Sequence, residues 1–70
     1  MNKVHNTYLK QGPRGQISGC QLAEVVVNTH FTNCDFHPNT FDLKYEGCIF
    51  ENCDVYAYDL SRANNCSFIN

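Results

Sequence analysis

Bulky apolar residues recur every five positions along most of this chain, a period that neither an α-helix nor a β-strand has. Counting in fives gives Tyr45, Phe50, Val55 and Leu60, and a second series, offset by one residue, gives Val26, Phe31, Phe36 and Phe41. A small residue often stands two positions before each centre, as do Cys34, Cys48 and Cys53, and Asp or Asn often stands between them. A repeat of this kind is typical of folds in which each unit forms one short segment and successive units stack.

The two series resemble the pentapeptide-repeat family, whose loose consensus is a small residue, Asp or Asn, Leu or Phe, and then two polar residues. The best matches are CDFHP at 34–38, CDVYA at 53–57 and YDLSR at 58–62, and the resemblance extends over about residues 22–68. It implies an all-β fold, a short right-handed quadrilateral β-helix of two to three coils with one pentapeptide on each side. The bulky centre and the small residue would face inward, and Asp and Asn would serve at the corners.

The pattern predicts which residues stack in successive coils. With one unit on each of four sides, every centre should stack on the fourth centre after it. The short step between positions 41 and 45 counts as one of these units. We therefore expect four stacked pairs: Val26 on Tyr45, Phe31 on Phe50, Phe36 on Val55, and Phe41 on Leu60. Cys34 should lie over Cys53 at about 5 Å between α-carbons, a spacing that a disulfide tolerates, although reduced buried thiols are the expectation in the cytosol.

Four residues depart from the pattern. Asn39 and Tyr58 occupy positions meant for small inward side chains, Asn65 stands where an apolar centre belongs, and Phe68 suits a centre only after another change of register. These departures predict distorted corners or a terminal cap rather than a long regular stack. The open ends of so short a stack carry unpaired backbone groups that need covering.

Two parts are expected along the chain, an N-terminal arm or cap over residues 1–16 and a β-helix body over residues 17–70. The segment QGPRGQ at residues 11–16 separates them, since proline and glycine favour tight turns. Within the arm, residues 4–9 are consistent with a short strand. At the start of the body, the three valines within residues 22–27 favour a strand over a helix. The arm is expected to cover one open end of the body.

Charge divides along the chain in the same place. Residues 1–16 have three basic side chains and no acid, whereas residues 17–70 have two basic and seven acidic side chains, a net charge of −5. Because nucleic-acid binding needs a clustered basic surface, direct binding of nucleic acid by the body is disfavoured. No apolar run is long enough for a secretory signal or a membrane span, and the cysteine count is odd at five, so we expect a cytoplasmic protein with reduced thiols and no membrane contact.

His30, Cys34 and His37 are potential zinc ligands, to which Cys48 or Cys53 could add a fourth. The segment lacks the paired CxxC spacing of structural zinc sites, and the repeat already accounts for the cysteines as small inward residues. A nucleophile formed by Cys34 and His37 is disfavoured because so short a chain has little room to enclose a pocket. We therefore expect no catalytic, cofactor-binding or metal-binding residues and no enzyme activity.

Some pentapeptide-repeat proteins resemble duplex DNA in shape and charge and inhibit DNA gyrase or other DNA-handling enzymes. By that resemblance, the predicted function is a non-catalytic protein-interaction module, a small phage or mobile-element inhibitor that binds a host DNA-handling enzyme as a DNA mimic. The predicted partner-binding residues are outward acids: Asp35, Glu46, Glu51, Asp54 and Asp59. Two alternatives stay open. In the first, the acids only cap corners or keep the protein soluble. In the second, the chain is a structural module that self-associates as a homodimer through its open β-helix end.

Overall fold

The computed structural model describes residues 1–11, 20, 21 and 24–70, and in this part the chain is all-β, without an α-helix. Two short 3-10 helices interrupt the strands, η1 (Pro38–Thr40) and η2 (Ala57–Asp59). The strands are β1 (Asn2–His5), β2 (Tyr8–Lys10), β3 (Cys20–Gln21), β4 (Val25–Val27), β5 (Thr29–Thr32), β6 (Asp35–Phe36), β7 (Lys44–Glu46), β8 (Ile49–Glu51), β9 (Ala63–Asn64) and β10 (Ser67–Ile69). The predicted all-β class is confirmed.

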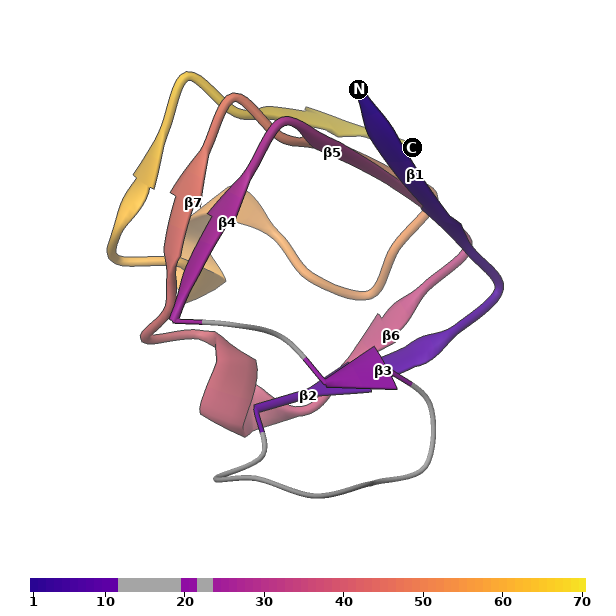
Figure 1. Ribbon diagram of the computed structural model, residues 1–70, viewed down its shortest axis with the longest axis horizontal. Coiled ribbons are helices and arrows are strands. Elements are labelled where there is room, and N and C mark those ends of the chain that lie inside the picture. Colours follow the sequence, from indigo (N-terminus) through magenta and orange to yellow (C-terminus); the bar gives the residue numbers. More distant parts are fainter. Residues whose placement is uncertain (12–19, 22–23) are drawn as a thin grey trace.

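The strands form three separate sheets in which every pairing is parallel (Figure 1). We call them sheet A (β1-β5-β8-β10), sheet B (β3-β2-β6) and sheet C (β4-β7-β9). From β4 onward the chain runs from sheet C to sheet A to sheet B, passes through η1, and returns to sheet C. Consecutive strands therefore lie in different sheets, and Figure 1 shows the three sheets arranged around a common interior.

The register between neighbouring strands matches two of the predicted stacks. Val26 pairs with Tyr45 in sheet C, and Phe31 pairs with Phe50 in sheet A, each with the centre that the repeat predicts. For the other two predicted pairs the described strands give no register. In the last layer the step along the chain is one residue shorter, because Tyr45 pairs with Ala63 and Phe50 pairs with Phe68. This shift is the second change of register, which the repeat pattern needed for Phe68 to be a centre.

Left-handed backbone marks the corners between the sheets. Six described residues have positive φ, namely Asn6, Asn28, Asn33, Asn52 and Asn65, with φ between 46° and 54°, and Gly47, with φ of 63°. Three of them directly follow a strand of sheet A, and the other three directly follow a strand of sheet C. Asn tolerates this conformation better than other residues with a side chain, and Gly tolerates it best.

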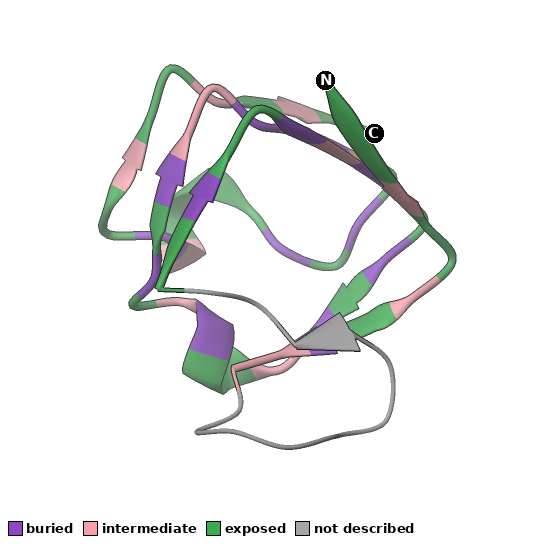
Figure 2. Cartoon of the chain, viewed as in Figure 1, coloured by how far each residue is buried: buried purple, intermediate pink, exposed green. Residues whose placement is uncertain are grey.

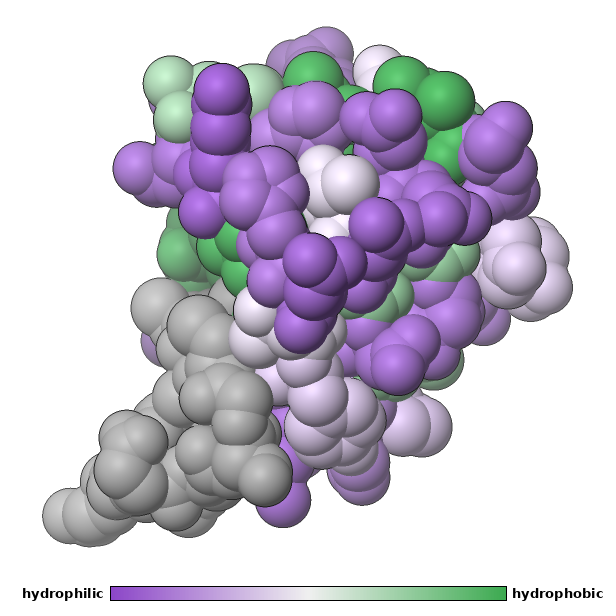
Figure 3. Space-filling model, turned by 90° about the vertical axis from the view of Figure 1, so that its right-hand side faces the viewer, coloured by the Kyte–Doolittle hydropathy of each residue, from purple (hydrophilic) through white to green (hydrophobic). Residues whose placement is uncertain are grey.

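The corner residues also stack from one layer to the next. The backbone N–H of Asn33 donates to the carbonyl oxygen of Glu51 at 3.0 Å, and the N–H of Asn52 donates to that of Ile69 at 2.7 Å. In addition, the side-chain amide of Asn52 donates to the Asn33 side-chain oxygen. Figure 3, which looks onto the corner between sheets A and B, shows a mostly hydrophilic described surface. Asn65, which appeared to replace an apolar centre, is a corner residue because of the shortened last step.

Each corner is closed by the side chain of the residue that follows it. That residue is Thr or Cys at all six corners, and it donates a hydrogen bond to the carbonyl oxygen two positions earlier. The donor–acceptor distances are 2.6 and 2.9 Å for the hydroxyls and 3.3 to 3.6 Å for the thiols. The donors are Thr7, Thr29, Cys34, Cys48, Cys53 and Cys66. Cysteine therefore recurs because a small thiol both closes the corner and packs against the apolar interior.

Two segments that the repeat predicts to be extended are 3-10 helices instead. In η1, Pro38 has φ fixed in the helical range and the His37 side chain accepts a hydrogen bond from the Asn39 N–H at 3.0 Å. In η2 the carboxylate of Asp59 accepts from the Tyr56 N–H at 3.1 Å. The predicted small inward residues at these two places are exposed instead, since Asn39 and Tyr58 are too polar or too large to enter the core.

The interior is filled by the bulky centres of the repeat (Figure 2). Phe50 stands in the middle, with the rings of Phe31 and Phe68 stacked on its two faces at centroid distances of 5.1 and 4.8 Å. Phe36 and Tyr45 meet the same ring edge-on at 5.6 and 5.4 Å. All of the predicted centres from Val26 to Leu60 are buried except Phe41, which is half-buried. Stacked and edge-to-face rings of this kind stabilise the fold beyond their area alone.

The N-terminal residues are part of the sheets. The strand predicted over residues 4–9 is broken at Asn6 into β1 and β2, because that residue adopts a left-handed corner. β1 forms one edge of sheet A, where Val4 pairs with Phe31, and β2 lies beside β6 in sheet B. Apart from Gln11, the turn predicted at residues 11–16 lies outside the described residues, and so do residues 22 and 23 of the other predicted strand. The domain division at residue 16 stays a prediction.

Candidate interaction surface

The outer face of sheet B carries two of the predicted acids, one above the other. Asp35 lies in β6 with an exposed side chain, and the backbone N–H of Asp54 donates to the carbonyl oxygen of Cys34 at 3.3 Å, which places Asp54 in the next layer beside Asp35. One carboxylate oxygen of Asp54 accepts from the backbone N–H of Phe36 at 2.8 Å. Asp54 therefore continues the ladder of sheet B with its side chain, while Asp35 has no side-chain hydrogen bond within the described residues.

Directly after Asp54 the chain presents two aromatic side chains to solvent. The rings of Tyr56 and Tyr58 are stacked with a centroid distance of 5.7 Å and an interplanar angle of 6°, and Tyr58 is 85% exposed. Asp59 is the last residue of η2, the 3-10 helix that contains Tyr58, and its side chain caps that helix. Asp54 thus lies beside Asp35 and is followed within five residues by the exposed tyrosine pair and by Asp59, which bonds to the N–H of Tyr56. We call Asp35, Asp54, Tyr56, Tyr58 and Asp59 the acidic tyrosine face.

The other two predicted acids lie elsewhere. Glu51 is on the outer face of sheet A, where its carboxylate contacts the His30 imidazole at 2.9 Å with both side chains partly exposed. Glu46 is on sheet C, in the strand that also carries Lys44. The five residues are therefore not gathered on one surface. The signal that sequence reasoning missed is the YAYD segment at residues 56–59, whose two tyrosines, two positions apart, meet because the chain turns into a 3-10 helix there.

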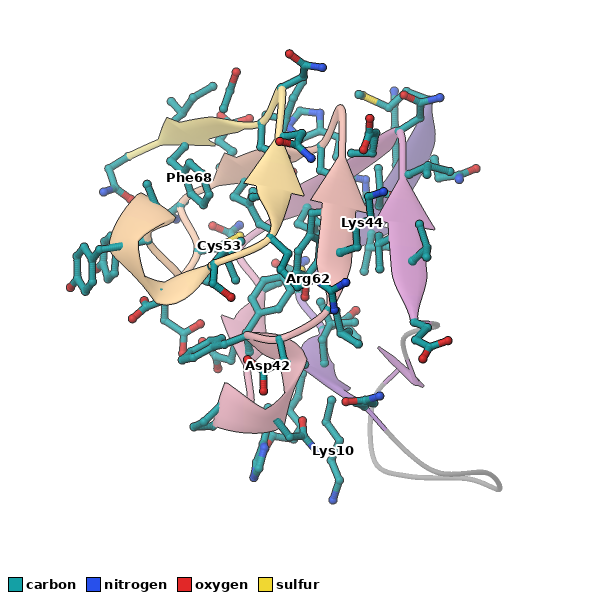
Figure 4. The ribbon with its side chains drawn as sticks, turned by 90° about the vertical axis from the view of Figure 1, so that its left-hand side faces the viewer. Lys10, Asp42, Lys44, Cys53, Arg62 and Phe68 are labelled. Carbon is teal, nitrogen blue, oxygen red and sulfur yellow. The ribbon has the colours of Figure 1, made fainter. Side chains whose placement is uncertain are left out.

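The outer face of sheet C carries basic side chains. The N–H of Tyr45 donates to the carbonyl oxygen of Arg62 at 3.0 Å, so Arg62 lies next to Lys44 across the strands, as Figure 4 shows. These are the two basic residues of the segment 17–70. Neither forms an ion pair within the described part of the chain. Their placement on sheet C leaves the acidic tyrosine face without a basic residue from this segment, although Lys10 lies in β2, the central strand of sheet B.

The residues considered as zinc ligands each make hydrogen bonds to a different partner. His30 contacts Glu51, the His37 ring accepts from a backbone N–H, and the Cys34 thiol donates to backbone carbonyl oxygens at 3.4 and 3.5 Å. No group of three or more His, Cys, Asp or Glu side chains in the described residues is arranged to hold a metal ion. The thiols of Cys34, Cys48, Cys53 and Cys66 are free. Cys34 and Cys53 lie in successive layers as predicted, and their thiols are not bonded to each other.

Burial, rather than a reactive neighbour, shifts the pKa values of the interior groups. It raises the pKa of the Cys53 thiol to about 11 and the pKa of the Tyr45 hydroxyl to about 12, because the charged forms lose their hydration. Burial likewise raises the pKa of Cys48. Nucleophilic or acid-base groups at active sites are commonly shifted toward neutral pH instead. The described part of the chain also opens no pocket and has no helix long and apolar enough to cross a membrane.

No protein-family model, no curated protein and no solved structure matches this chain. Its function is therefore argued from its own residues.

Proposed function

We propose that this protein is a short right-handed quadrilateral β-helix of the pentapeptide-repeat type that acts as a non-catalytic protein-interaction module. Three observations support this architecture: parallel pairing throughout, the chain's repeated return to sheets C and A, and three pairings between centres almost four repeat units apart, Val26 with Tyr45, Phe31 with Phe50, and Phe50 with Phe68. In this proposal η1 and η2 occupy the fourth side, where the departures at Asn39 and Tyr58 occur.

The proposed activity is inhibition of a host DNA-handling enzyme, as expected of a small phage or mobile-element protein that mimics DNA charge. The observation that carries it is the grouping of carboxylates on the acidic tyrosine face: Asp35, Asp54 and Asp59 lie there, whereas Lys44 and Arg62 lie on sheet C, where Glu46 accompanies them. A basic groove that normally holds DNA would meet carboxylates on that face, and a guanidinium group of the groove could stack on the exposed Tyr58 ring.

The size of the stack defines how much of such a groove it covers. Sheet A has four strands, which span about 14 Å at the usual interstrand spacing. Duplex DNA carries about eight phosphates over that length. Three carboxylates on one face match only part of that charge, so the proposed contact is a small basic site and not a long DNA-binding channel. Two of the three carboxylates also accept backbone hydrogen bonds, and this fixes their positions.

Matched charge reversals test the proposal. Asp35→Lys changes the acidic tyrosine face at a residue without a side-chain hydrogen bond in the described chain, and Glu46→Lys makes the same change of charge on sheet C. The measurement is inhibition of DNA supercoiling by purified DNA gyrase, with partner capture from extract followed over a salt series. We expect Asp35→Lys to lose both and Glu46→Lys to keep both, with capture lost above about 0.5 M salt. Full inhibition by Asp35→Lys would refute the assignment of this face. The same measurement on Glu46→Lys/Glu51→Lys reports whether the remaining two predicted acids take part.

A second candidate function is assembly through the open end formed by β9 and β10. These strands are the last in sheets C and A, so their outer backbone groups have no partner strand in the described structure. Phe68 ends the ring stack there with its side chain half-buried, and Ile69 is 48% exposed. Light scattering distinguishes the two candidates. A monomeric mass that persists at high protein concentration contradicts assembly, and a salt-insensitive dimer without enzyme inhibition contradicts the inhibitor.

A further inference from the structure

The corner cysteines of successive layers lie one above another in two pairs. At the corner that follows sheet A, Cys34 and Cys53 lie in neighbouring layers, because the N–H of Asp54 donates to the carbonyl oxygen of Cys34 at 3.3 Å. At the corner that follows sheet C, Cys48 and Cys66 lie in neighbouring layers in the same way. All four cysteines are free. The structure therefore presents two thiol pairs, each joining two layers of the fold.

Cys48 and Cys66 occupy equivalent positions in neighbouring layers. The residues that follow them, Ile49 and Ser67, are register partners in sheet A, and the N–H of Ser67 donates to the carbonyl oxygen of Cys48 at 3.0 Å. Their α-carbons are therefore separated by about the interstrand spacing of 4.8 Å, inside the range of about 4.4–6.8 Å that disulfides occupy. Each thiol hydrogen-bonds a carbonyl of its own corner, so rotation about one Cα–Cβ bond is needed to bring the two sulfurs together.

The two pairs differ in how solvent reaches them. Cys34 and Cys53 are both buried, with 1% and 6% of their surface exposed. Cys48 is fully buried, but Cys66 is half-buried in the last layer, where its hydrogen bond to Asn64 is exposed. Burial raises the pKa of Cys48, so that thiol by itself reacts slowly with an oxidant in solution. Of these four thiols, Cys66 is the one that a soluble oxidant can reach first.

We propose that Cys48 and Cys66 are a redox modification site, forming a reversible disulfide by exchange with a small disulfide such as oxidised glutathione. The Cys66 thiolate attacks one sulfur of glutathione disulfide, whose S–S bond breaks, and the departing glutathione thiolate takes up a proton. Cys48 then loses its proton and attacks the Cys66 sulfur of the mixed disulfide, releasing the second glutathione thiol. Two electrons pass to the glutathione disulfide, and one S–S bond replaces another.

This disulfide would fasten the C-terminal strand to the layer beneath it. β10 pairs with β8 through only three residues and has no partner strand on its other side in the described structure. The cross-link sits one residue before this pairing. Because side chains at equivalent positions of parallel layers point in the same direction, closing the bond requires a change of rotamer, which makes the disulfide more easily reduced than a structural one. The proposal does not depend on the function proposed above.

Tryptic mapping separates the possible products. Cleavage after Lys44 and Arg62 places Cys48 and Cys53 in residues 45–62 and Cys66 in residues 63–70, and cleavage after Arg14 leaves Cys20 and Cys34 in residues 15–44. The full chain is incubated with glutathione disulfide, its remaining thiols are alkylated, and the digest is analysed by mass spectrometry. We expect peptide 45–62 linked to 63–70, and loss of this species after dithiothreitol treatment.

Two serine variants make the assignment specific. Cys53→Ser should keep the cross-linked species, because it leaves Cys48 and Cys66 in place. Cys48→Ser should abolish it and leave a mixed glutathione disulfide on Cys66, an adduct that shows Cys66 reacting with glutathione disulfide without Cys48. The proposal is overturned if the unchanged protein retains glutathione on Cys66, if peptide 63–70 is linked to a second copy of itself, or if peptide 15–44 is linked to 45–62 instead.

Discussion

The hydroxyl of Tyr45 donates a hydrogen bond of 2.9 Å to the carbonyl oxygen of Thr40, and both side chains are fully buried. The bond ties the end of η1 to the central strand of sheet C. We expect Tyr45→Phe to lower the free energy of unfolding by about 1–2 kcal/mol, because the Thr40 carbonyl loses its partner inside the core. Urea denaturation measures this change. Tyr58→Phe is the matched control, since Tyr58 is 85% exposed, and its stability should be unchanged.

Alkaline pH should unfold the protein in a range set by buried groups. The pKa of Tyr45 is raised from 10.0 to about 12 in the folded chain, so the neutral phenol favours folding. Its contribution is complete below about pH 10 and is lost as the pH rises toward about 12. Cys53, with its pKa raised to about 11, adds a loss that begins near the ordinary thiol value of 9.0. Stability measured by urea denaturation should fall from pH 9 to 12, and less steeply in Tyr45→Phe; equal slopes would contradict the assignment.

The corner at Asn65 provides a test of left-handed backbone. Asn65 has φ of 54°, a conformation that costs a residue with a Cβ about 1–2 kcal/mol. Asn65→Gly should therefore leave the stability nearly unchanged or raise it, whereas Asn65→Ala should lower it by about 1 kcal/mol. Thermal or urea unfolding distinguishes them. If both variants were equally stable, backbone strain would not determine the residue at this corner.

Replacing Gly47 should have a larger effect than replacing an Asn corner by Ala. Gly47 has φ of 63°, and a Cβ at this position would lie 2.9 Å from the side-chain oxygen of Asn28 in the neighbouring layer. Gly47→Ala combines the backbone cost with this close contact, so we expect a loss of about 2 kcal/mol or more. The double variant Gly47→Ala/Asn28→Gly removes the contact and should recover part of the loss. No recovery would assign the whole effect to the backbone.

The ring stack predicts unequal costs for two phenylalanines. Phe50 is 1% exposed and contacts rings on both faces and at its edges, whereas Phe68 ends the stack and is half-buried. Phe50→Ala should destabilise by about 3–5 kcal/mol, which is a large part of the stability of so small a domain. Phe68→Ala should cost clearly less, unless the open end is covered by a second subunit. Urea denaturation at two protein concentrations measures both effects.

Sequence reasoning identified the parts of this fold that depend on which side chains enter the core. The recurrence of bulky centres located Phe31 above Phe50 and Val26 above Tyr45, since burial of large apolar side chains leaves few alternative registers. It also indicated that the end of the chain would be irregular, and the last step between layers is indeed shorter. The β-helix assignment and the family resemblance stay proposals.

Less of the candidate surface could be predicted from the sequence. Outward positions obey no packing constraint, so the spacing could not tell that Glu46 and Glu51 lie on different sheets from Asp35. The open alternative that acids cap corners agrees with the backbone hydrogen bonds of Asp54 and Asp59 but not with Asp35, because such bonds depend on where the chain leaves the extended conformation. The tyrosine pair arises from the same local change at η2.

The sequence alone determined which side chains are inside, because hydrophobic burial acts on each residue through its own apolar surface. The tertiary structure decided how the chain turns between those residues. At Asn33 and Asn52 the left-handed corner, the following thiol and the layer above must all fit together, and such agreement between distant segments cannot be inferred from one segment by itself. The positions of the acids, the exposed rings and the paired thiols follow from those turns.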